Sequence, residues 1–342
     1  MDFDPTVPAD DLTWMQTYAA SEMVELQGEG RIDRREMLTR LVAICGSTAA
    51  AQAFLASCSS TPSTSTATGS STTATALGGG TNLGSATTAT YPTASANAVT
   101  PPTGGPAGRV LSVSTDDPDI RGTDVTFAGP AGPMFGYLAT PSTAGARPGI
   151  LVIHEIFGLT DHIRDVARRL AKVGYLALSV DLASRAGGSA NAENVMTALT
   201  GGPVADRLAD LDAATTFLRT QPGFNGKLGV TGFCFGGGMT LSYAAFQPDV
   251  LAAVPYYGPT PQPASDMSKT TAAILAHYGE TDARVNASIP DLEAAMAGKT
   301  FEKRVHAGAG HAFNNDTGGA YNETVAIEAW GQTLTWFARH LR

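Results

Sequence analysis

The sequence is poor in charge, in cysteine and in long apolar runs. Only 15% of its 342 residues are charged, and acids outnumber bases by 31 to 22. A nucleic-acid-binding protein needs clustered positive charge to displace counterions from phosphates, so we expect no nucleic-acid partner. No apolar run reaches the roughly 18–20 residues that cross a bilayer as a helix. Three cysteines without C-x-x-C spacing predict neither a disulfide framework nor a zinc site.

The charge that is present is distributed unevenly along the chain. Residues 41–108 contain no charged residue, although charged residues occur on both sides of this stretch. We therefore predict a leader over 1–57, a flexible linker over 58–105 and one globular domain over 106–342. The linker is rich in Ser, Thr, Ala, Gly and Pro, which offer too little apolar surface to offset the entropy of ordering. The domain is long enough to bury a large core.

The leader carries the features of an export signal. The weakly apolar stretch 41–56 suits the h-region of a secretory signal. Before it, Arg34 and Arg35 resemble the twin-arginine signal. After it, the Leu-Ala-Ser-Cys sequence ending at Cys58 resembles the bacterial lipobox, in which cleavage leaves an acylated cysteine first. These resemblances imply export and a lipid anchor at Cys58 on a cell-envelope membrane, outside the cytoplasm. The alternative is an amphipathic surface helix with an incidental arginine pair.

Strand-like and helix-like segments alternate from Thr123 onward. The later strands are continuous apolar runs, as expected for strands covered on both faces. The alternation predicts an α/β fold with a mainly parallel central sheet and helices on both faces. The first two strands are expected to form an antiparallel hairpin. The expected strands are 123–128, 134–140, 149–154, 175–180, 227–232, 251–257, 272–279 and 301–306, and the expected helices are 161–172, 204–220, 235–246, 289–298 and 320–340.

A glycine-rich turn between a strand and a helix is the strongest local signal. It reads G-x-C-x-G, the nucleophile elbow with Cys234 in the place of serine. Gly232 and Gly236 remove side chains that would collide in so sharp a turn. A cysteine at a helix N-terminus is also favoured as a thiolate. The alternatives are a buried structural cysteine and a phosphate-binding loop, but the Lys and Ser/Thr that a phosphate loop requires are missing.

An acid and a histidine follow the elbow in the chain order of this class of hydrolase. Asp282 and His311 each come directly after a predicted strand. The carboxyl ends of parallel strands form the site of an open α/β sheet, so both residues are expected beside Cys234. Glu280 is a rival for the acid. The order and the placement together predict a Cys-His-Asp triad.

With these motifs, the domain from about Arg121 to Arg342 resembles the dienelactone hydrolase family of α/β-hydrolases. The resemblance is carried by the sequences at 154–158, 181–185, 232–238 and 310–313. It implies the α/β-hydrolase fold and a Cys-His-Asp enzyme that acts on enol-lactones. The partner is then a small-molecule lactone or ester.

The resemblance also implies roles for residues outside the triad. Glu155 matches a glutamate that hydrogen-bonds the resting thiol and helps to activate it. The backbone N–H groups of Ile156 and Phe235 would form the oxyanion hole. Arg185 matches an arginine that holds the substrate carboxylate. Where the family's dienelactone enzymes carry a second arginine, this sequence has Asn315, so its pocket can accept a different lactone or activated ester.

The sequence predicts no cofactor and no metal. His154-Glu155 could begin the zinc motif H-E-x-x-H, but Gly158 stands where its second histidine is required. His162, His277 and His306 are expected to be structural or surface residues. The sequence does not fix the oligomeric state, and a monomer is compatible with it.

The first hypothesis for function is a hydrolase that opens a lactone or activated enol ester through a thioester acyl-enzyme. The alternatives are a thioesterase or general carboxylesterase on the same triad, and a non-catalytic, lipid-anchored binding protein on a hydrolase fold. Rapid alkylation of the thiol near neutral pH would separate a live nucleophile from an inert one.

Overall fold

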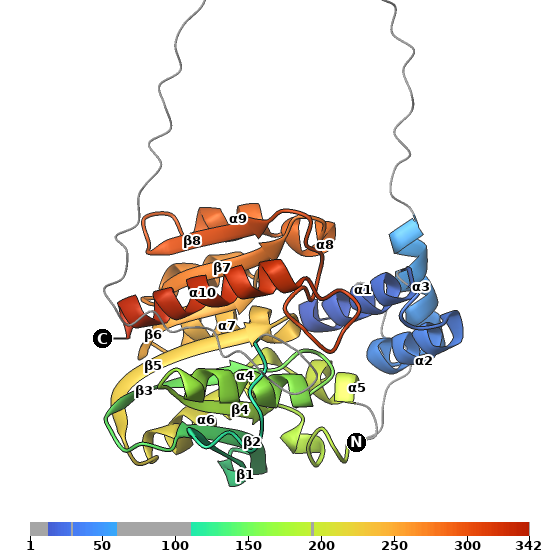
Figure 1. Ribbon diagram of the computed structural model, residues 1–342. Coiled ribbons are helices and arrows are strands. Elements are labelled where there is room, and N and C mark those ends of the chain that lie inside the picture. The colour runs from blue at the N-terminus through green and yellow to red at the C-terminus, as the bar shows by residue number, and fades with distance from the viewer. Residues whose placement is uncertain (1–12, 29, 60–110, 193–194, 342) are drawn as a thin grey trace, which may run out of the picture.

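The computed structural model describes residues 13–28, 30–59, 111–192 and 195–341 (Figure 1). The predicted linker lies almost entirely outside these residues. Cys58 falls within a described helix, but its side chain lies outside the description. The domain boundaries therefore stay a prediction.

One eight-stranded sheet forms the centre of the molecule, in the order β1-β2-β4-β3-β5-β6-β7-β8. β1 pairs antiparallel with β2, which confirms the predicted hairpin, and β2 pairs antiparallel with β4. All other neighbours pair in parallel, because helices carry the chain back between them. The strands are β1 (Ile120–Gly129), β2 (Gly132–Pro141), β3 (Arg147–Ile153), β4 (Leu176–Asp181), β5 (Phe224–Phe233), β6 (Val250–Tyr256), β7 (Ala273–Gly279) and β8 (Phe301–His306).

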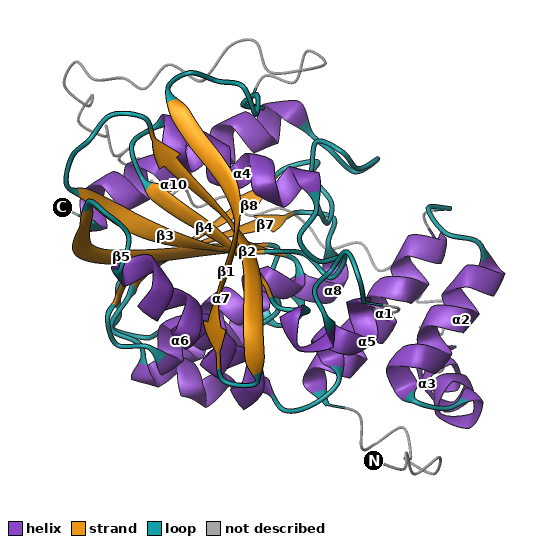
Figure 2. Cartoon of the chain, turned by 90° about the horizontal axis from the view of Figure 1, so that it is seen from below, coloured by secondary structure: helices purple, strands orange, loops and turns teal. Residues whose placement is uncertain are grey.

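Helices cover both faces of this sheet. α4 (Asp161–Lys172) and α10 (Glu323–His340) lie on one face, and α6 (Val204–Arg219) and α7 (Phe235–Phe246) lie on the other (Figure 2). The inner strands and α7 are buried almost throughout, in keeping with their continuous apolar sequence. The predicted α/β-hydrolase fold is confirmed, and its predicted element ends differ from the structure by at most three residues.

The leader folds into three helices beside the carboxyl ends of the parallel strands (Figure 1). They are α1 (Trp14–Gly28), α2 (Arg34–Cys45) and α3 (Thr48–Ser59). α1 and α2 pack on each other, and both contact α5 (Val195–Thr200). The remaining short elements are the 3₁₀ turns Ser184–Ala186 and Ala264–Lys269 and the helices α8 (Ala283–Asn286) and α9 (Ile289–Ala295).

The stretch expected to be an h-region is divided between α2 and α3. Asp33 caps α2, accepting a hydrogen bond from the Glu36 N–H at 2.8 Å, and Gly46 ends it in the left-handed conformation. Its larger apolar side chains are mostly covered: Leu41 is fully buried and Phe54 is 6% exposed, while Val42 and Leu55 are half-buried. In the described part of the chain, no single helix is long and apolar enough to cross a membrane. Arg34–Cys45 and Thr48–Ser57 qualify only as a pair, with a bend of 108° between them.

Candidate active site

Cys234 occupies a sharp turn between β5 and α7, as the G-x-C-x-G pattern predicts. Its φ of 56° lies in the left-handed region, which is strained for a residue with a side chain. A Cβ on Gly232 would lie 2.2 Å from the carbonyl oxygen of Gly236, and one on Gly236 would lie 2.3 Å from that of Ile153. The two glycines are therefore required by backbone packing. They let the turn place the thiol at the N-terminus of α7.

His311 and Asp282 meet at the same edge of the sheet, from loops that follow β8 and β7. The Nδ1 of His311 lies 2.5 Å from the Asp282 carboxylate, whose other oxygen accepts the Val285 N–H at 3.1 Å. The rival acid is directed elsewhere, because Glu280 accepts the backbone N–H of Gly308 at 2.9 Å. A ring nitrogen of His311 lies within 4.8 Å of the Cys234 sulfur. The structure thus brings the three predicted triad residues together.

Glu155 is buried near the thiol but is held by other partners. The Tyr257 hydroxyl donates to one carboxylate oxygen at 3.4 Å, and the Asn315 amide donates to the other at 2.6 Å. Among the described residues, no hydrogen bond joins Glu155 to Cys234. Asn315, the position at which the sequence departs from the family pattern, thus fixes the orientation of Glu155.

The two predicted oxyanion-hole residues come from adjoining segments. Phe235 is the first residue of α7, so its N–H has no acceptor within the helix. Ile156 lies in the loop after β3, and this loop approaches the start of α7 closely, since a Cβ on Gly236 would lie 2.5 Å from the carbonyl oxygen of His154. The backbone around Ile156 and Phe235 is therefore drawn together beside Cys234.

Arg185 is paired with carboxylates of its own chain. Its Nε lies 2.8 Å from the buried Asp210 carboxylate, and its Nη1 lies 3.4 Å from Asp206. A guanidinium held by two carboxylates is less available to a substrate. Its role as a carboxylate ligand stays a prediction.

Helix α1 of the leader covers the triad, which the sequence did not reveal. The Tyr18 hydroxyl lies 3.3 Å from the Cys234 sulfur and 3.4 Å from the Nε2 of His311. A carboxylate oxygen of Glu22, one turn later, lies 3.5 Å from the same nitrogen. Both α1 side chains are buried, with 7% and 3% of their surface exposed.

Arg284 joins α1 to the catalytic side of the molecule. It lies in α8, two residues after Asp282, and its guanidinium binds the carboxylates of Glu22 and Glu25. The same guanidinium stacks on the Tyr18 ring, 4.5 Å from its centroid. The sequence pattern could not predict this role of Arg284, because its two carboxylate partners are about 260 residues away in sequence.

The Glu22 carboxylate of α1 raises the pKa of both the Cys234 thiol and His311. Burial raises the pKa of the Cys234 thiol, and the Glu22 carboxylate adds to the rise, although His311 opposes it. Burial alone would lower the pKa of His311. The negative charges beside it, with Glu22 first among them, outweigh burial and hold the pKa of His311 well above its ordinary value.

Glu22, Cys234 and His311 also form a set of three potential metal ligands within 4.8 Å of one another. However, the guanidinium of Arg284 already binds the Glu22 oxygen that this set would offer. Its positive charge opposes a cation at that point. The cluster is therefore better described as a hydrogen-bonded contact between the leader and the triad.

Four of the remaining histidines are buried and held within the fold. Nδ1 of His277 lies 3.1 Å from Nε2 of His306, so these two form a pair, which the sequence analysis did not predict. His154 accepts the Leu182 N–H at 3.0 Å through its Nε2, and His162 contacts Asp316. These contacts are those of structural residues, in keeping with the expectation from sequence.

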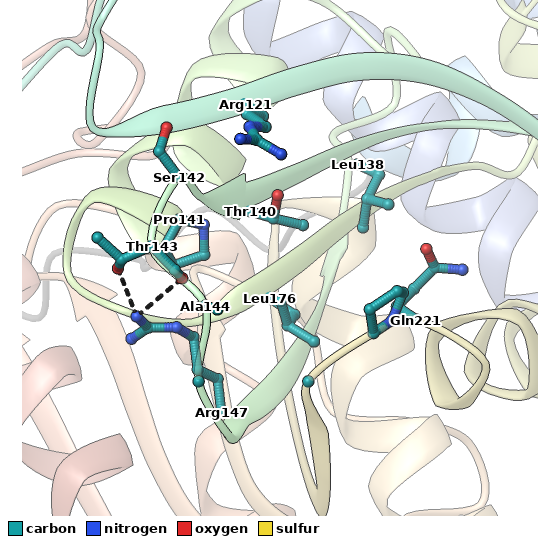
Figure 3. Close-up of a pocket in the computed structure, with 13 residues that line it drawn as sticks. Arg121, Leu138, Thr140, Pro141, Ser142, Thr143, Ala144, Arg147, Leu176 and Gln221 are labelled. Atoms are coloured by element: carbon teal, nitrogen blue, oxygen red, sulfur yellow. Dashed lines mark hydrogen bonds between the residues drawn. The ribbon is translucent and has the colours of Figure 1, made fainter.

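A cavity of about 470 Å³ lies at the other end of the strands (Figure 3). It is lined by the end of β2 and the beginnings of β1, β3 and β4, from which Arg121, Leu138, Arg147 and Leu176 come. None of its lining residues belongs to the triad. The triad itself lies at the carboxyl ends, where the side chains of α1 occupy the space in front of it.

Comparisons with known proteins agree with this geometry. The sequence pattern of the Dienelactone hydrolase family matches residues 134–341. A protein of Methylorubrum extorquens named "Putative carboxymethylenebutenolidase" is 34% identical over 252 residues, which cover 69% of this chain and 87% of that protein. A Bradyrhizobium protein named "Probable 2-oxo-3-(5-oxofuran-2-ylidene)propanoate lactonase" is 33% identical over 223 residues, which cover 60% of this chain and 89% of that protein.

Solved structures support the same assignment. A structure titled "Putative Dienelactone Hydrolase" from Klebsiella pneumoniae aligns with a TM-score of 0.60 and 34% identity, and covers 64% of this chain and 99% of that one. The family match spans more than half of the chain, together with the fold and the elbow. The chain therefore belongs to the dienelactone hydrolase family and is a hydrolase of small-molecule lactones or esters.

Proposed function

We propose that the enzyme opens a lactone or activated enol ester through a thioester on Cys234. His311 takes the thiol proton, and the sulfur attacks the carbonyl carbon. The backbone N–H groups of Ile156 and Phe235 bind the oxyanion that develops. The ring C–O bond then breaks, and His311 returns the proton to the departing oxygen. Water, deprotonated by His311, cleaves the thioester and restores the thiol.

The observation that carries this proposal is the contact between Asp282 and His311 beside the elbow. The 2.5 Å contact to Nδ1 fixes the imidazole tautomer and leaves Nε2 facing the thiol. A thiolate displaces an enolate readily and an ordinary alkoxide poorly. Enol-lactones and enol esters are therefore the expected substrates, and plain alkyl esters are expected to react slowly.

Glu155 has a separate role in the proposal. Its carboxylate is fixed by Tyr257 and Asn315, so activation of the thiol by Glu155 requires the carboxylate to turn away from the Asn315 amide. Asn315→Ala would free it to do so. We expect this variant to alter the rate of thiol acylation more than the affinity for substrate, measured by single-turnover kinetics.

The acyl-enzyme is the decisive intermediate. Rapid quenching of a reaction with an enol ester, followed by peptide mass spectrometry, should show the acyl group on the peptide that contains Cys234. Hydroxylamine should remove it, as expected for a thioester. Turnover without an adduct on this peptide, under conditions where acylation is faster than hydrolysis, would overturn the mechanism.

For the leader, we propose twin-arginine export followed by cleavage before Cys58 and acylation of its thiol. The arginine pair, the apolar stretch and the Leu-Ala-Ser-Cys sequence support this proposal. Leu41, Ile44 and Phe54 are buried in α2 and α3, so recognition requires these helices to unfold or detach. Intact mass of the membrane fraction should show a lipid-modified chain that starts at Cys58. A full-length chain in soluble form only would contradict it.

A further inference from the structure

The side chains of α1 fill the position that a substrate must take. A reacting carbonyl has to lie against the Cys234 sulfur and within reach of His311. In the full chain, the Tyr18 hydroxyl is 3.3 Å from that sulfur, and both Tyr18 and Glu22 lie within 3.5 Å of the Nε2 of His311. These contacts leave no room for a lactone ring between the thiol and the imidazole.

The helix also presents a carboxylate to a half-buried cation, Arg284. Glu22 is 3% exposed, and its charge is balanced by Arg284, whose Nε is bonded to Glu25 at 2.9 Å. Within the described part of the chain, the Nη1 of Arg284 is buried without a hydrogen-bond partner. A guanidinium has donors in a fixed fork that matches a carboxylate. Without α1, Arg284 would face the catalytic edge with its charge unpaired by these two acids.

We propose that α1 is a built-in occupant of the active site, in which Glu22 takes the place of a substrate carboxylate on Arg284. The inference rests on the hydrolase function proposed above and adds two things to it. The substrate carries a carboxylate that Arg284 binds once Glu22 has left. In addition, the full chain is held inactive until α1 leaves, and cleavage before Cys58 would sever α1 from the catalytic domain.

The two arginines of the site differ in how available they are. Arg185 is bound to Asp206 and Asp210, which lie in α6 of the catalytic domain and stay with it. Arg284 is bound to acids that leave with the leader. Detachment of α1 therefore frees Arg284 and leaves the pairing of Arg185 intact. This difference makes Arg284 the better carboxylate ligand.

An opening variant of the full chain, Tyr18→Ala/Glu22→Ala, tests the occupation of the site. Thr17→Ala/Ser21→Ala is its matched control, because these positions precede the first pair by one residue on the same helix and lie at its exposed or half-exposed side. We expect the opening variant to raise kcat/KM for an enol-lactone and the alkylation rate of Cys234 by iodoacetamide, each at least about tenfold. Peptide mass spectrometry separates Cys234 from the other thiols. The control should stay within about twofold of the unmodified chain.

The carboxylate is tested with a carboxylated enol-lactone and its neutral methyl ester. In the opening variant, Arg284→Gln should lower the ratio of kcat/KM for the acid over the ester about 10- to 100-fold, the loss expected for a charged hydrogen bond. The loss should lie in KM, and Arg284→Lys should restore part of it. An unchanged ratio in a folded Arg284→Gln variant would overturn the assignment of Arg284.

The remaining outcomes separate this inference from the proposed function. If the unmodified chain reacted with iodoacetamide and with the lactone as fast as the opening variant, α1 would not be an inhibitor and the inference would fail, while the hydrolase function would stand. If Cys234 reacted faster in the opening variant but neither substrate was hydrolysed, occupation by α1 would be supported and the hydrolase function would be overturned.

Discussion

Two helices meet at Cys234. One, α7, begins directly after it in the sequence, and the other, α1, lies more than 200 residues before it. α7 presents the thiol, and its place is set by glycines within two residues of the thiol. α1 covers the thiol, and its contacts with Cys234 and Arg284 join residues more than 200 positions apart. The first arrangement is local and strained. The second joins segments far apart in sequence, through the contacts of Arg284 with Tyr18, Glu22 and Glu25. The comparison teaches that an active site can be complete in geometry and still be closed by its own leader.

The largest expected effect concerns the α7 side of the comparison. In the opening variant, Cys234→Ala should lower kcat/KM on an enol-lactone by about four orders of magnitude or more, because the nucleophile is lost. His311→Ala should cost a comparable factor, since the triad acts as a unit. Circular dichroism should show that both variants are folded. A folded Cys234→Ala variant with near-normal turnover would end the assignment of the elbow.

A second prediction tests whether the elbow turn requires glycine at position 232. Gly232→Ala should lower the free energy of unfolding by about 2–4 kcal/mol, because its Cβ would lie 2.2 Å from a backbone oxygen. Gly331→Ala is the control. It lies on the exposed side of α10 with nothing within 4 Å of the added Cβ, and it should stabilise by about 0.5–1 kcal/mol. Urea denaturation measures both changes, and equal effects would show that the turn is not sterically constrained.

A third prediction compares the two arginines. Arg185→Ala should lower the free energy of unfolding by about 1–3 kcal/mol, because the buried Asp210 loses one of its ion-pair partners and keeps the more distant Arg207. The preference of the opening variant for the carboxylated lactone over its methyl ester should change less than it does with Arg284→Gln. Should Arg185→Ala abolish that preference while stability stays the same, the carboxylate ligand would be Arg185.

The smallest expected effect is a pH dependence on the α1 side. The folded pKa of His311 is raised, so its contribution to stability is fully present below its unfolded pKa of about 6.5 and is lost as pH rises through the folded pKa. Among the described residues, the titratable groups that face its imidazole are Tyr18, Glu22, Cys234, Tyr257 and Asp282. Glu22→Gln removes one of the negative charges that raise this pKa.

This variant should therefore destabilise the full chain more at pH 6 than at pH 9, by on the order of 1 kcal/mol. Denaturant unfolding at the two pH values measures the difference. The ion pair with Arg284 contributes equally at both, so it cancels in the comparison. An identical loss at pH 6 and pH 9 would mean that Glu22 does not act on His311.

Much of the catalytic domain could be predicted from sequence because its determinants are local. The continuous apolar strands gave the sheet, and the ends of α4, α7 and β8 were predicted to the residue. Gly232 and Gly236 marked the elbow, and the chain order of Asp282 and His311 led to the triad. Glu280 could be set aside only when the structure showed it bound to the Gly308 N–H.

The cover over the triad could not be predicted, because its residues are ordinary in their own sequence context. Tyr18 and Glu22 lie in a leader whose arginine pair and apolar stretch point to export. Arg284 lies in a short turn of helix without a motif. Only the long-range fold brings these three together. The role of Asn315 could not be predicted either. The sequence shows only that it stands where the family's dienelactone enzymes have an arginine, whereas in the structure its amide donates a hydrogen bond to Glu155.

Removal of the leader from a folded chain tests the central claim most directly. A specific protease site inserted within residues 60–110 would allow cleavage after folding, and gel filtration would then separate the leader from the catalytic domain. We predict that kcat/KM for a carboxylated enol-lactone rises at least about tenfold after separation. A leader polypeptide of residues 13–59 should then inhibit in competition with the substrate, and its Glu22→Ala form should inhibit less. A separated domain with unchanged kcat/KM that the leader does not inhibit would contradict the account.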